Sequence, residues 1–382
     1  MQNRNIIIGE GDHMGRIMDY VTWRGDLSFN QVPFNAIDAA IFSQLSIFDF
    51  DNIVPSEGEG RSIKDVFELY LGKGYKLSDP VTFLMSNKQH YLFEALAKSD
   101  RYKDLKLGNY RRIHNQLYPC QFEAMTIELD DLMLISFGGT DDTIVGWHED
   151  FELLYLEEIP AHKYGKEYLE EILKITDKDI VLLGHSKGAN ISMEVLLGVS
   201  HETFDRVKRV YCFDGPGISQ KEYEQALLDG RINKITAYIP YKSTIGRLFD
   251  HCEEYKIVEC TANLAYQHDL LTWHVYQNDF IYKDHLSTDS IYLDKHLKMI
   301  INEMTQDEKT AFVSSLFNLM YTTGSKTLTE LYKNKTKFVA NMLKIKKDDK
   351  NILNKIFMQK ILKDQRIRKI FIALFREFNN RD

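Results

Sequence analysis

The stretch that most constrains the fold is residues 180–198, which read IVLLGHSKGANISMEVLLG. An apolar, strand-like run ends in Gly184-His185-Ser186-Lys187-Gly188, and a helix-favouring segment follows at once. A strand, a G-x-S-x-G turn and a helix in this order are typical of a nucleophile elbow, in which a sharp turn raises the serine above the end of a sheet. Small residues on either side let the strand and the helix approach each other, and the helix N-terminus favours an anion formed there. The pattern predicts that Ser186 is a nucleophile; the alternative is a serine in an ordinary turn.

The residues around this elbow alternate between strand-like and helical patterns, from about residue 121 to 290. FEAMTIELDDLMLISFGGT predicts two strands joined by a tight turn at Asp130-Asp131, and residues 162–176 predict a helix. Further strands are predicted within RVKRVYCFDGPG, RINKITAYIP and EYKIVECTA. Strands that alternate with helices favour an α/β fold with a mostly parallel sheet and helices on both faces.

Segments on both sides of this core have helical periodicity. Residues 1–120 contain NAIDAAIFSQLSIF, SIKDVFELYLGKG and LFEALAKSDRY, and Asn35 and Ser62 suit the N-caps of the first two helices. Residues 291–382 predict four amphipathic helices, with sequences that include SIYLDKHLKMIINEM, EKTAFVSSLFNLMYTTG, KTLTELYKNKTKFVANML and NILNKIFMQKILKDQRIRKIFIALFREF. We therefore expect a helical N-terminal segment packed on the core, a core at 121–290, and a C-terminal helical region that serves as a lid or an accessory part.

The net charge of −8 conceals an uneven distribution along the chain. From Lys326 onward there are 16 Lys and Arg against 6 Asp and Glu, a balance of +10 that leaves −18 for the preceding residues. The basic C-terminal helices suggest a peripheral contact with a membrane surface, or a packed pair of helices with a solvated basic face. The acidic body argues against nucleic-acid binding.

Cellular location is predicted from what the sequence lacks. The four cysteines are scattered without a C-x-x-C pair, which indicates neither a zinc site nor a disulfide framework. The first twenty residues have no long apolar region with a small-residue cleavage site, and no window approaches 18 continuous apolar residues. We expect a cytoplasmic protein.

An acyl-transfer site needs an oxyanion hole, an acid and a base besides its nucleophile. The amide of Lys187 and the strand-end segment Gly138-Gly139-Thr140 are the candidate oxyanion donors. Asp214 ends the strand after the elbow helix and is the candidate acid, with Asp250 and Asp269 as rivals. His268 follows the last strand-like run and is a candidate base. The competing histidines are His251, His274 and His285.

Two of these motifs together resemble the class three lipases. FGGT-x6-W-x2-D, from Phe137 to Asp150, and GHSKG are similar to the F-R-G-T, downstream Trp and Asp, and GHSLG of those enzymes. The resemblance implies an α/β-hydrolase core with Ser186 as nucleophile and Thr140 in the oxyanion hole. The arginine of F-R-G-T is replaced here by Gly138. Those lipases also place their acid after the next strand, where this chain reads ITAYIPYKST without a carboxylate.

A more specific resemblance extends over roughly residues 15–380. The chain is similar to a bacterial, mostly Firmicute, α/β-hydrolase family related to those lipases, which shares DY-x2-WRGD-x-SF-x3-PFN, an FDGPG strand end and a Q-H-D segment before a tryptophan. These motifs correspond here to Asp19–Asn35, Phe213–Gly217 and Gln267-His268-Asp269 before Trp273. This resemblance supports His268 over the other histidines. Asp214 also resembles, in position, the acid of pancreatic-type lipases.

Together the motifs predict a serine hydrolase of the esterase or lipase type that acts on a small-molecule or lipid ester. His268 would take the proton of Ser186 as general base, and Asp214 would hold the imidazole in its working tautomer. Thr140 and Lys187 would bind the oxyanion, and no metal or organic cofactor is required. The alternative function is that of a catalytically silent hydrolase fold kept for binding or scaffolding, because the acid is the least secure member of the triad.

Overall fold

The structure is a computed structural model that describes residues 15–78, 81–82, 85, 87–248, 255–262 and 264–369. The chain forms two compact units. The first comprises Met1–Ile113, Phe122–Gly139 and His162–Ser287, and the second comprises His114–Gln121, Thr140–Ala161 and Thr288–Asp382. This division differs from the predicted boundaries at residues 120 and 290. The N-terminal segment joins the core in one unit, and two short stretches from the middle of the chain join the C-terminal helices.

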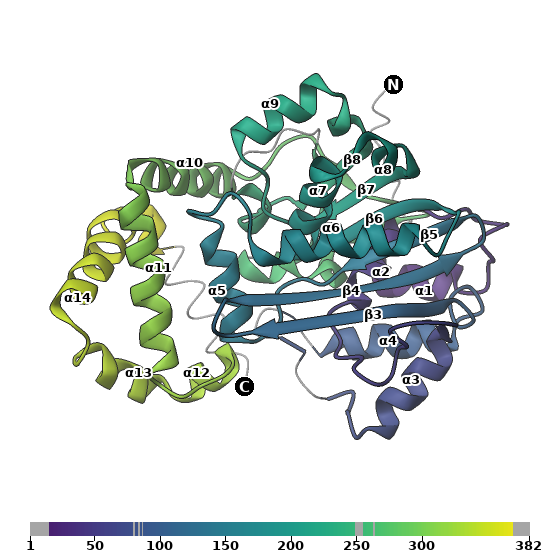
Figure 1. The fold of residues 1–382 in the computed structure, drawn as a ribbon, viewed down its shortest axis with the longest axis horizontal. Helices are drawn as coiled ribbons and strands as arrows, with labels where there is room; N and C mark the ends of the chain where they lie inside the picture. The colour runs from purple at the N-terminus through teal and green to yellow at the C-terminus, as the bar shows by residue number, and fades with distance from the viewer. Residues whose placement is uncertain are drawn as a thin grey trace. The chain divides into compact units, whose positions relative to one another are not determined.

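A nine-stranded sheet runs through the first unit in the order β12-β9-β8-β7-β6-β5-β4-β3-β2 (Figure 1). Strands β5 to β9 pair in parallel, whereas β4 with β5, β2 with β3 and β12 with β9 pair in antiparallel fashion. The strands are β2 (Arg61–Ser62), β3 (Lys106–Asn115), β4 (Cys120–Leu129), β5 (Leu132–Phe137), β6 (Asp179–His185), β7 (Val207–Phe213), β8 (Ile235–Pro240), β9 (Tyr255–Val258) and β12 (Tyr282–Lys283). The predicted α/β class with a mostly parallel sheet is confirmed, as is the tight turn at Asp130-Asp131 between β4 and β5.

Alternate side chains of the central strands point to opposite faces, as the period of two in a strand requires. On one face, Val181 and Leu183 of β6 and Phe213 of β7 share a buried core with the N-terminal helices. On the other face, Cys212 contacts the backbone of α7 (Lys187–Gly198) and Phe137 packs against Tyr168 of α6 (Pro160–Leu173). The helices between residues 17 and 98 therefore cover one face, while α6, α7 and the short helix His201–Arg206 cover the other (Figure 1).

The helices of the first unit are α1 (Ile17–Arg24), α2 (Ala36–Leu45), α3 (Ile63–Gly72), α4 (Lys88–Lys98), α6 (Pro160–Leu173), α7 (Lys187–Gly198), α8 (His201–Arg206) and α9 (Gln220–Leu228). Helices α2, α3, α4, α6 and α7 correspond to the predicted helical segments, whereas α1, α8 and α9 are not among the predictions. Asn35 accepts hydrogen bonds from the first amides of α2, and Ser62 accepts one from the amide of Asp65 in α3. Both predicted N-caps are confirmed. The predicted helical stretch to residue 120 does not hold throughout, since β2 and β3 lie within it and belong to the sheet.

A buried polar network fixes the N-terminal helices to one another. Arg101 forms an ion pair with Asp38 at 2.6 Å, and both side chains are fully buried. Arg101 also donates to the carbonyls of Leu27 and Val32. Asp38 accepts a hydrogen bond from the Tyr102 hydroxyl as well. The network ties the loop that follows the W-R-G-D motif to α2, which gives that region a packing role.

The remaining elements of the first unit are short. A separate three-stranded sheet, β1-β10-β11, consists of β1 (Gly15–Arg16), β10 (His274–Tyr276) and β11 (Asp279–Phe280). The 3₁₀ turns are η1 (Arg231–Lys234), η2 (Ile245–Arg247), η3 (Leu264–His268) and η4 (Leu270–Thr272). Turns η2 and η3 follow β8 and β9, so they lie where the parallel strands end.

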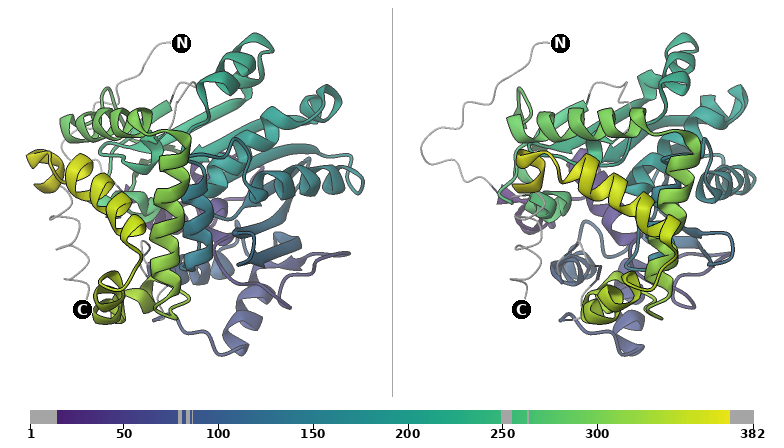
Figure 2. Two further views of the ribbon diagram at one scale, coloured as in Figure 1. Left: turned by 60° about the vertical axis from the view of Figure 1, so that its left-hand side comes forward. Right: turned by 90° about the vertical axis from the view of Figure 1, so that its left-hand side faces the viewer.

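The second unit is helical. Its elements are α5 (Ile144–Glu152), α10 (Thr288–Glu303), α11 (Gln306–Tyr321), α12 (Leu328–Lys333), α13 (Lys335–Met342), α14 (Lys347–Leu353) and the π-helical η5 (Asn354–Ile361). Its core gathers apolar side chains such as Ile144, Phe317 and Ile356. Figure 2 shows α14 and η5 beside α11, where the rings of Phe312 and Phe357 lie 5.4 Å apart.

Two predictions for this region need adjustment. The single helix expected over KTLTELYKNKTKFVANML is interrupted at Asn334, which ends α12 and precedes α13. The last predicted helix is described only as far as residue 369, so its apolar positions Ile370, Phe371, Leu374 and Phe375 lie outside the described residues. Among the described helices, none combines the length and the apolar character needed to span a bilayer.

Candidate active site

Ser186 lies in a sharp turn between β6 and α7. Its φ of 57° and ψ of −127° are an uncommon combination for a residue with a side chain. Its amide donates to the carbonyl of Phe213 at 2.9 Å, which ties the turn to the neighbouring strand β7. A Cβ on Gly184 would lie 2.2 Å from the backbone of Gly188, so glycine is required for the strand and the helix to pass this closely. This is the strand–turn–helix geometry that the G-x-S-x-G pattern predicts.

Asp214 leaves the sheet beside Ser186. His185 at the end of β6 pairs with Phe213 at the end of β7, so the two residues that follow leave the same edge of the sheet. Asp214 has a φ of 43° and is almost fully buried. Its Oδ1 accepts a hydrogen bond from Ser243 Oγ at 2.6 Å and from the amide of Gly246 at 3.0 Å. The turn after β8 therefore fixes one carboxylate oxygen, and the other is left for a further donor.

That further donor is His268, at the end of η3. Its Nδ1 lies 2.7 Å from Asp214 Oδ2, and both side chains are buried. Because a carboxylate only accepts hydrogen bonds, the contact places the proton on Nδ1 and leaves Nε2 as the ring's basic nitrogen. A buried Asp–His pair is therefore built from the ends of β7 and the segment after β9.

His185, which directly precedes the serine, contacts the same histidine. Its Nε2 lies 2.8 Å from the backbone carbonyl of His268, and the two rings are tilted by 36° with their centroids 4.3 Å apart. Burial holds the pKa of His185 well below its usual value, so the ring is neutral and donates Nε2–H to the carbonyl. This contact links the position of His268 to the elbow that carries Ser186.

The backbone after β5 passes close to the elbow as well. A Cβ on Gly139 would lie 2.8 Å from the carbonyl oxygen of His185 and 3.5 Å from Ser186 Cβ. Gly138 is similarly enclosed, by Glu123 and by the carbonyl of Ser46. The two glycines therefore let the backbone after β5 pass close to the elbow. An arginine at position 138, as in F-R-G-T, would not fit this backbone path unchanged.

The two predicted oxyanion donors differ in their surroundings. Lys187 is the first residue of α7 and its side chain is buried. Its amide therefore lies at the N-terminus of that helix, directly after the N-cap residue Ser186. Thr140 falls in the second unit, where its hydroxyl donates to the carboxylate of Asp150. The motif residues Thr140 and Asp150, which are ten positions apart, are thus hydrogen-bonded partners.

The rival acids and bases are placed differently. Asp250 and His251 lie outside the described residues. Asp269 accepts hydrogen bonds from Gln89 Nε2 at 2.9 Å and from the amide of Leu271 at 3.0 Å, so it caps η4. His274 is in β10, in the small sheet, and the ring of His285 lies beside that of Tyr241. Of the described candidates, Asp214 and His268 are the acid and the base that the structure brings together.

Sequence reasoning missed the residues that support the pair. Ser243 and Gly246 lie in YKSTIGR, just after β8, where a hydroxyl and a glycine look like ordinary turn residues. The only available signal was indirect. The predicted acid, Asp214, follows β7, one strand earlier than the acid of the class three lipases. The segment after β8 contains no carboxylate, but it contains Ser243, whose hydroxyl can donate to one.

The sheet order, the elbow and the Asp–His pair at its edge define the first unit as an α/β-hydrolase fold. A family model described as Mbeg1-like matches residues 96–318, which is more than half of the chain. The chain belongs to the Mbeg1-like family. A search of curated proteins returned no match.

Solved structures with some similarity are fungal and other lipases. A native Rhizomucor miehei lipase–propeptide complex is 12% identical over 67% of this chain and 76% of that one, with a TM-score of 0.35. A triacylglycerol lipase whose catalytic centre is a serine protease triad is 13% identical over 64% and 85%, also at 0.35. The N225Q mutant of MDLA from Penicillium cyclopium is 10% identical over 59% and 78%, at 0.33. Similarities this distant carry no statement about what the chain acts on.

Proposed function

We propose that the chain is a serine hydrolase of the esterase or lipase type, which cleaves a carboxylic ester through an acyl-enzyme on Ser186. The observation that carries the proposal is the buried pair of His268 Nδ1 and Asp214 Oδ2, 2.7 Å apart. The pair is set beside a serine whose φ is 57°. Structural ion pairs are common, but they rarely combine with a strained serine at the same edge of a parallel sheet.

Each residue then has a defined task. His268 Nε2 takes the proton of Ser186 Oγ as the oxygen attacks the ester carbonyl, and returns it to the leaving alcohol. Asp214 keeps the proton of the imidazole on Nδ1 and stabilises the imidazolium that forms. Water, activated by the same histidine, then hydrolyses the acyl-enzyme and restores the serine.

The oxyanion of the tetrahedral intermediate needs hydrogen-bond donors that are already in place. The amide of Lys187, at the N-terminus of α7, is the first of these. The F-G-G-T motif implies Thr140 as the second donor, and this part of the proposal rests on the sequence motif alone. The hydroxyl of Thr140 donates to Asp150, so its proton is already used within the second unit.

The test uses the full chain and a fluorophosphonate probe, with intact mass as the readout. We expect one adduct per chain in the wild type, no adduct in Ser186→Ala, and labelling at least a hundredfold slower in His268→Ala. Ser192→Ala is the matched control. This buried serine lies on the same helix and donates only to the carbonyl of Gly188. It should therefore label at the wild-type rate.

A panel of p-nitrophenyl esters from acetate to palmitate then measures the preferred acyl length. If the wild type forms no adduct with or without detergent while remaining folded, the enzyme proposal fails. The chain is then a hydrolase fold kept for binding or scaffolding.

A further inference from the structure

Helix α13 in the second unit carries apolar side chains on two sides. Phe338 and the nearby Ile345 pack against the core of the unit. Val339, Met342 and Leu343 are instead exposed, by 57%, 39% and 73%. Their spacing of three and four residues places them on one face of the helix and its last turn. An apolar face that is exposed to solvent on a short helix promotes association, so it is expected to be covered by a partner.

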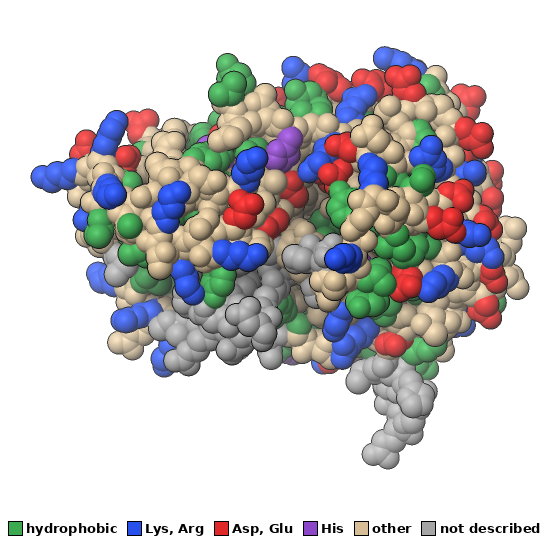
Figure 3. Space-filling view, turned by 90° about the horizontal axis from the view of Figure 1, so that it is seen from below, with side chains coloured by type: hydrophobic (Ala, Val, Ile, Leu, Met, Phe, Trp, Pro, Cys, Tyr) green, Lys and Arg blue, Asp and Glu red, His purple; other side chains and the backbone are tan. Residues whose placement is uncertain are grey.

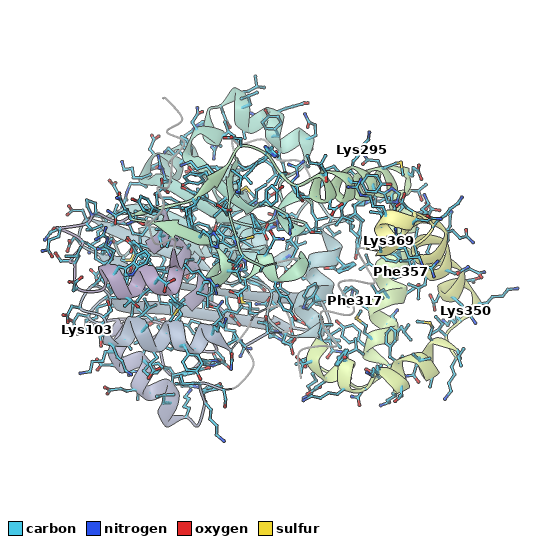
Figure 4. The ribbon with its side chains drawn as sticks, turned by 180° about the vertical axis from the view of Figure 1, so that it is seen from behind. Lys103, Lys295, Phe317, Lys350, Phe357 and Lys369 are labelled. Atoms are coloured by element: carbon cyan, nitrogen blue, oxygen red, sulfur yellow. The ribbon has the colours of Figure 1, made fainter. Side chains whose placement is uncertain are left out.

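The charge around this face is of a single sign. Residues 333–347 contain six lysines and no acidic residue. Lys337 donates to the carbonyl of Thr323. The other lysines form no ion pair with any described residue, and all are exposed: Lys333, Lys335, Lys344, Lys346 and Lys347. Lys350, which follows on α14, also projects away from the helices (Figure 4).

Several basic residues after residue 350, in contrast, form ion pairs with acidic residues. Lys355 pairs with Glu308, Lys360 with Glu303, and Arg366 with Asp289. Cationic side chains are spread over the visible surface of this unit (Figure 3). The distinguishing property of residues 333–347 is therefore the combination of unpaired lysines with an exposed aliphatic face, not basic charge alone.

A second exposed apolar pair provides a contrast. Leu227 and Leu228 at the end of α9 are exposed by 56% and 82%. Their helix carries Glu222 and Glu224 and is followed by Asp229. An anionic partner would be repelled there, whereas the α13 surface would attract it.

We infer that residues 333–347 form a docking surface for an anionic phospholipid bilayer. Aliphatic side chains enter the boundary between headgroups and acyl chains, and flexible lysines reach the phosphates around them. Nucleic-acid sites also contact phosphates through lysine, but they add arginine and aromatic stacking and gain little from an exposed Val-Met-Leu face. This inference does not depend on Ser186 being a nucleophile.

The test is vesicle flotation of the full chain with no ester substrate present. Vesicles of phosphatidylcholine and phosphatidylglycerol in equal parts are compared with vesicles of phosphatidylcholine alone, at 0.1 M and 0.5 M NaCl. We expect binding to the anionic vesicles only. The higher salt should weaken this binding at least tenfold, because it screens the attraction between the lysines and the lipid phosphates.

Two variants test the two components of the surface. Lys344→Ser/Lys346→Ser/Lys347→Ser should lower the partition coefficient about a hundredfold, through the loss of three charges near the lipid. Val339→Ser/Leu343→Ser should lower it about tenfold, through the loss of buried apolar area. All five side chains are exposed, so thermal melting should be unchanged.

Matched controls change the same properties elsewhere. Lys64→Ser/Lys163→Ser/Lys208→Ser removes the same charge from exposed lysines of the first unit, and Leu227→Ser/Leu228→Ser removes the apolar pair on α9. Both should bind vesicles like the wild type.

Four outcomes would overturn the inference. They are the absence of flotation with anionic vesicles, equal flotation with neutral vesicles, and equal losses in the control variants. The fourth is a dimer in lipid-free buffer that Val339→Ser/Leu343→Ser dissociates, which would assign the surface to a second copy of the chain.

Discussion

Ser243 Oγ donates a hydrogen bond of 2.6 Å to Asp214 Oδ1, so the turn after β8 holds an acid that comes from the end of β7. In the class three lipases that this sequence resembles, the turn after β8 is the expected place of the acid itself. Here that turn contributes Ser243 and the amide of Gly246, which both donate to the same oxygen. The carboxylate is therefore supplied by one strand end and oriented by the next.

Removing the hydroxyl of Ser243 should slow catalysis without unfolding the protein. We expect Ser243→Ala to reduce the rate constant of fluorophosphonate labelling about tenfold, because a hydrogen bond to a charged group is worth roughly 1.5 kcal/mol or more. Gly246→Ala should cost about a hundredfold, since its Cβ would lie 2.3 Å from Asp214 Oδ1. Ser219→Ala, which removes the cap of α9, is the control and should not alter labelling. Wild-type labelling in both site variants would show that Asp214 needs no such support.

The backbone strain at Ser186 should appear as a difference in stability between two inactive variants. Glycine tolerates positive φ, whereas alanine at a φ of 57° and ψ of −127° keeps the strain. We expect Ser186→Gly to be more stable than Ser186→Ala by about 1 kcal/mol. This net value allows for the extra conformational entropy that glycine gives the unfolded chain, which opposes the relief of strain. Urea denaturation of the two variants measures this difference. A less stable glycine variant would contradict it.

Acid should weaken the second unit through His148. Burial lowers the pKa of this histidine from 6.5 to about 4, and its ring stacks on Phe317 with centroids 4.4 Å apart. Between these pH values the unfolded chain binds a proton that the folded chain does not, so the free energy of unfolding falls as pH falls from 6.5 to 4. We expect His148 alone to contribute a loss of about 2 kcal/mol over this range, partly offset by its neighbour Glu152, whose pKa burial raises to about 7.

The variant His148→Phe separates this effect from other titrations. It keeps the stacked ring and removes the titrating nitrogen, although the Tyr321 hydroxyl loses its partner at Nδ1. The difference in unfolding free energy between wild type and variant should therefore change with pH between 6.5 and 4 and be constant above pH 7. A difference that stays constant throughout would rule out His148 as the source.

Breaking the buried ion pair of Asp38 and Arg101 should be costly. Arg101→Met leaves a fully buried carboxylate without its cation, for which we expect a loss of about 3–5 kcal/mol in urea denaturation. Adding Asp38→Asn should recover part of that loss, because a neutral amide is cheaper to bury than a carboxylate. If the double variant is as unstable as the sum of the two single variants, the two side chains do not act as a pair.

Much of the fold was predictable because its signals are local. Apolar runs marked the parallel strands, and Asn35 and Ser62 marked the starts of two helices. The elbow around Ser186 could be predicted for the same reason, since its glycines, strand and helix are adjacent in the sequence. The pairing of Asp214 with His268 was accessible only through the order of strand ends and a family resemblance.

Other features depend on contacts between distant residues. Strand β3 lies in a region whose sequence predicts helices, because KLGNYRRIHN has no continuous apolar run and many of its residues are only partly buried. The second unit draws residues 140–161 from the middle of the chain, which no local pattern indicates. Ser243 has an ordinary turn sequence, and its role is visible only once β7 and β8 lie side by side.

The shared core of the N-terminal helices and the sheet has a consequence for how such a protein can be recombined. Phe42 and Phe93 lie in the same buried cluster as Leu183 and Phe213, so the N-terminal helices supply much of the covering of one face of the sheet. A chain shortened to begin at residue 121 would expose much of that face and leave β4 as an open edge, a combination that promotes aggregation. The segment that carries the elbow therefore cannot be transferred to another protein by itself. The first 120 residues have to be transferred with it.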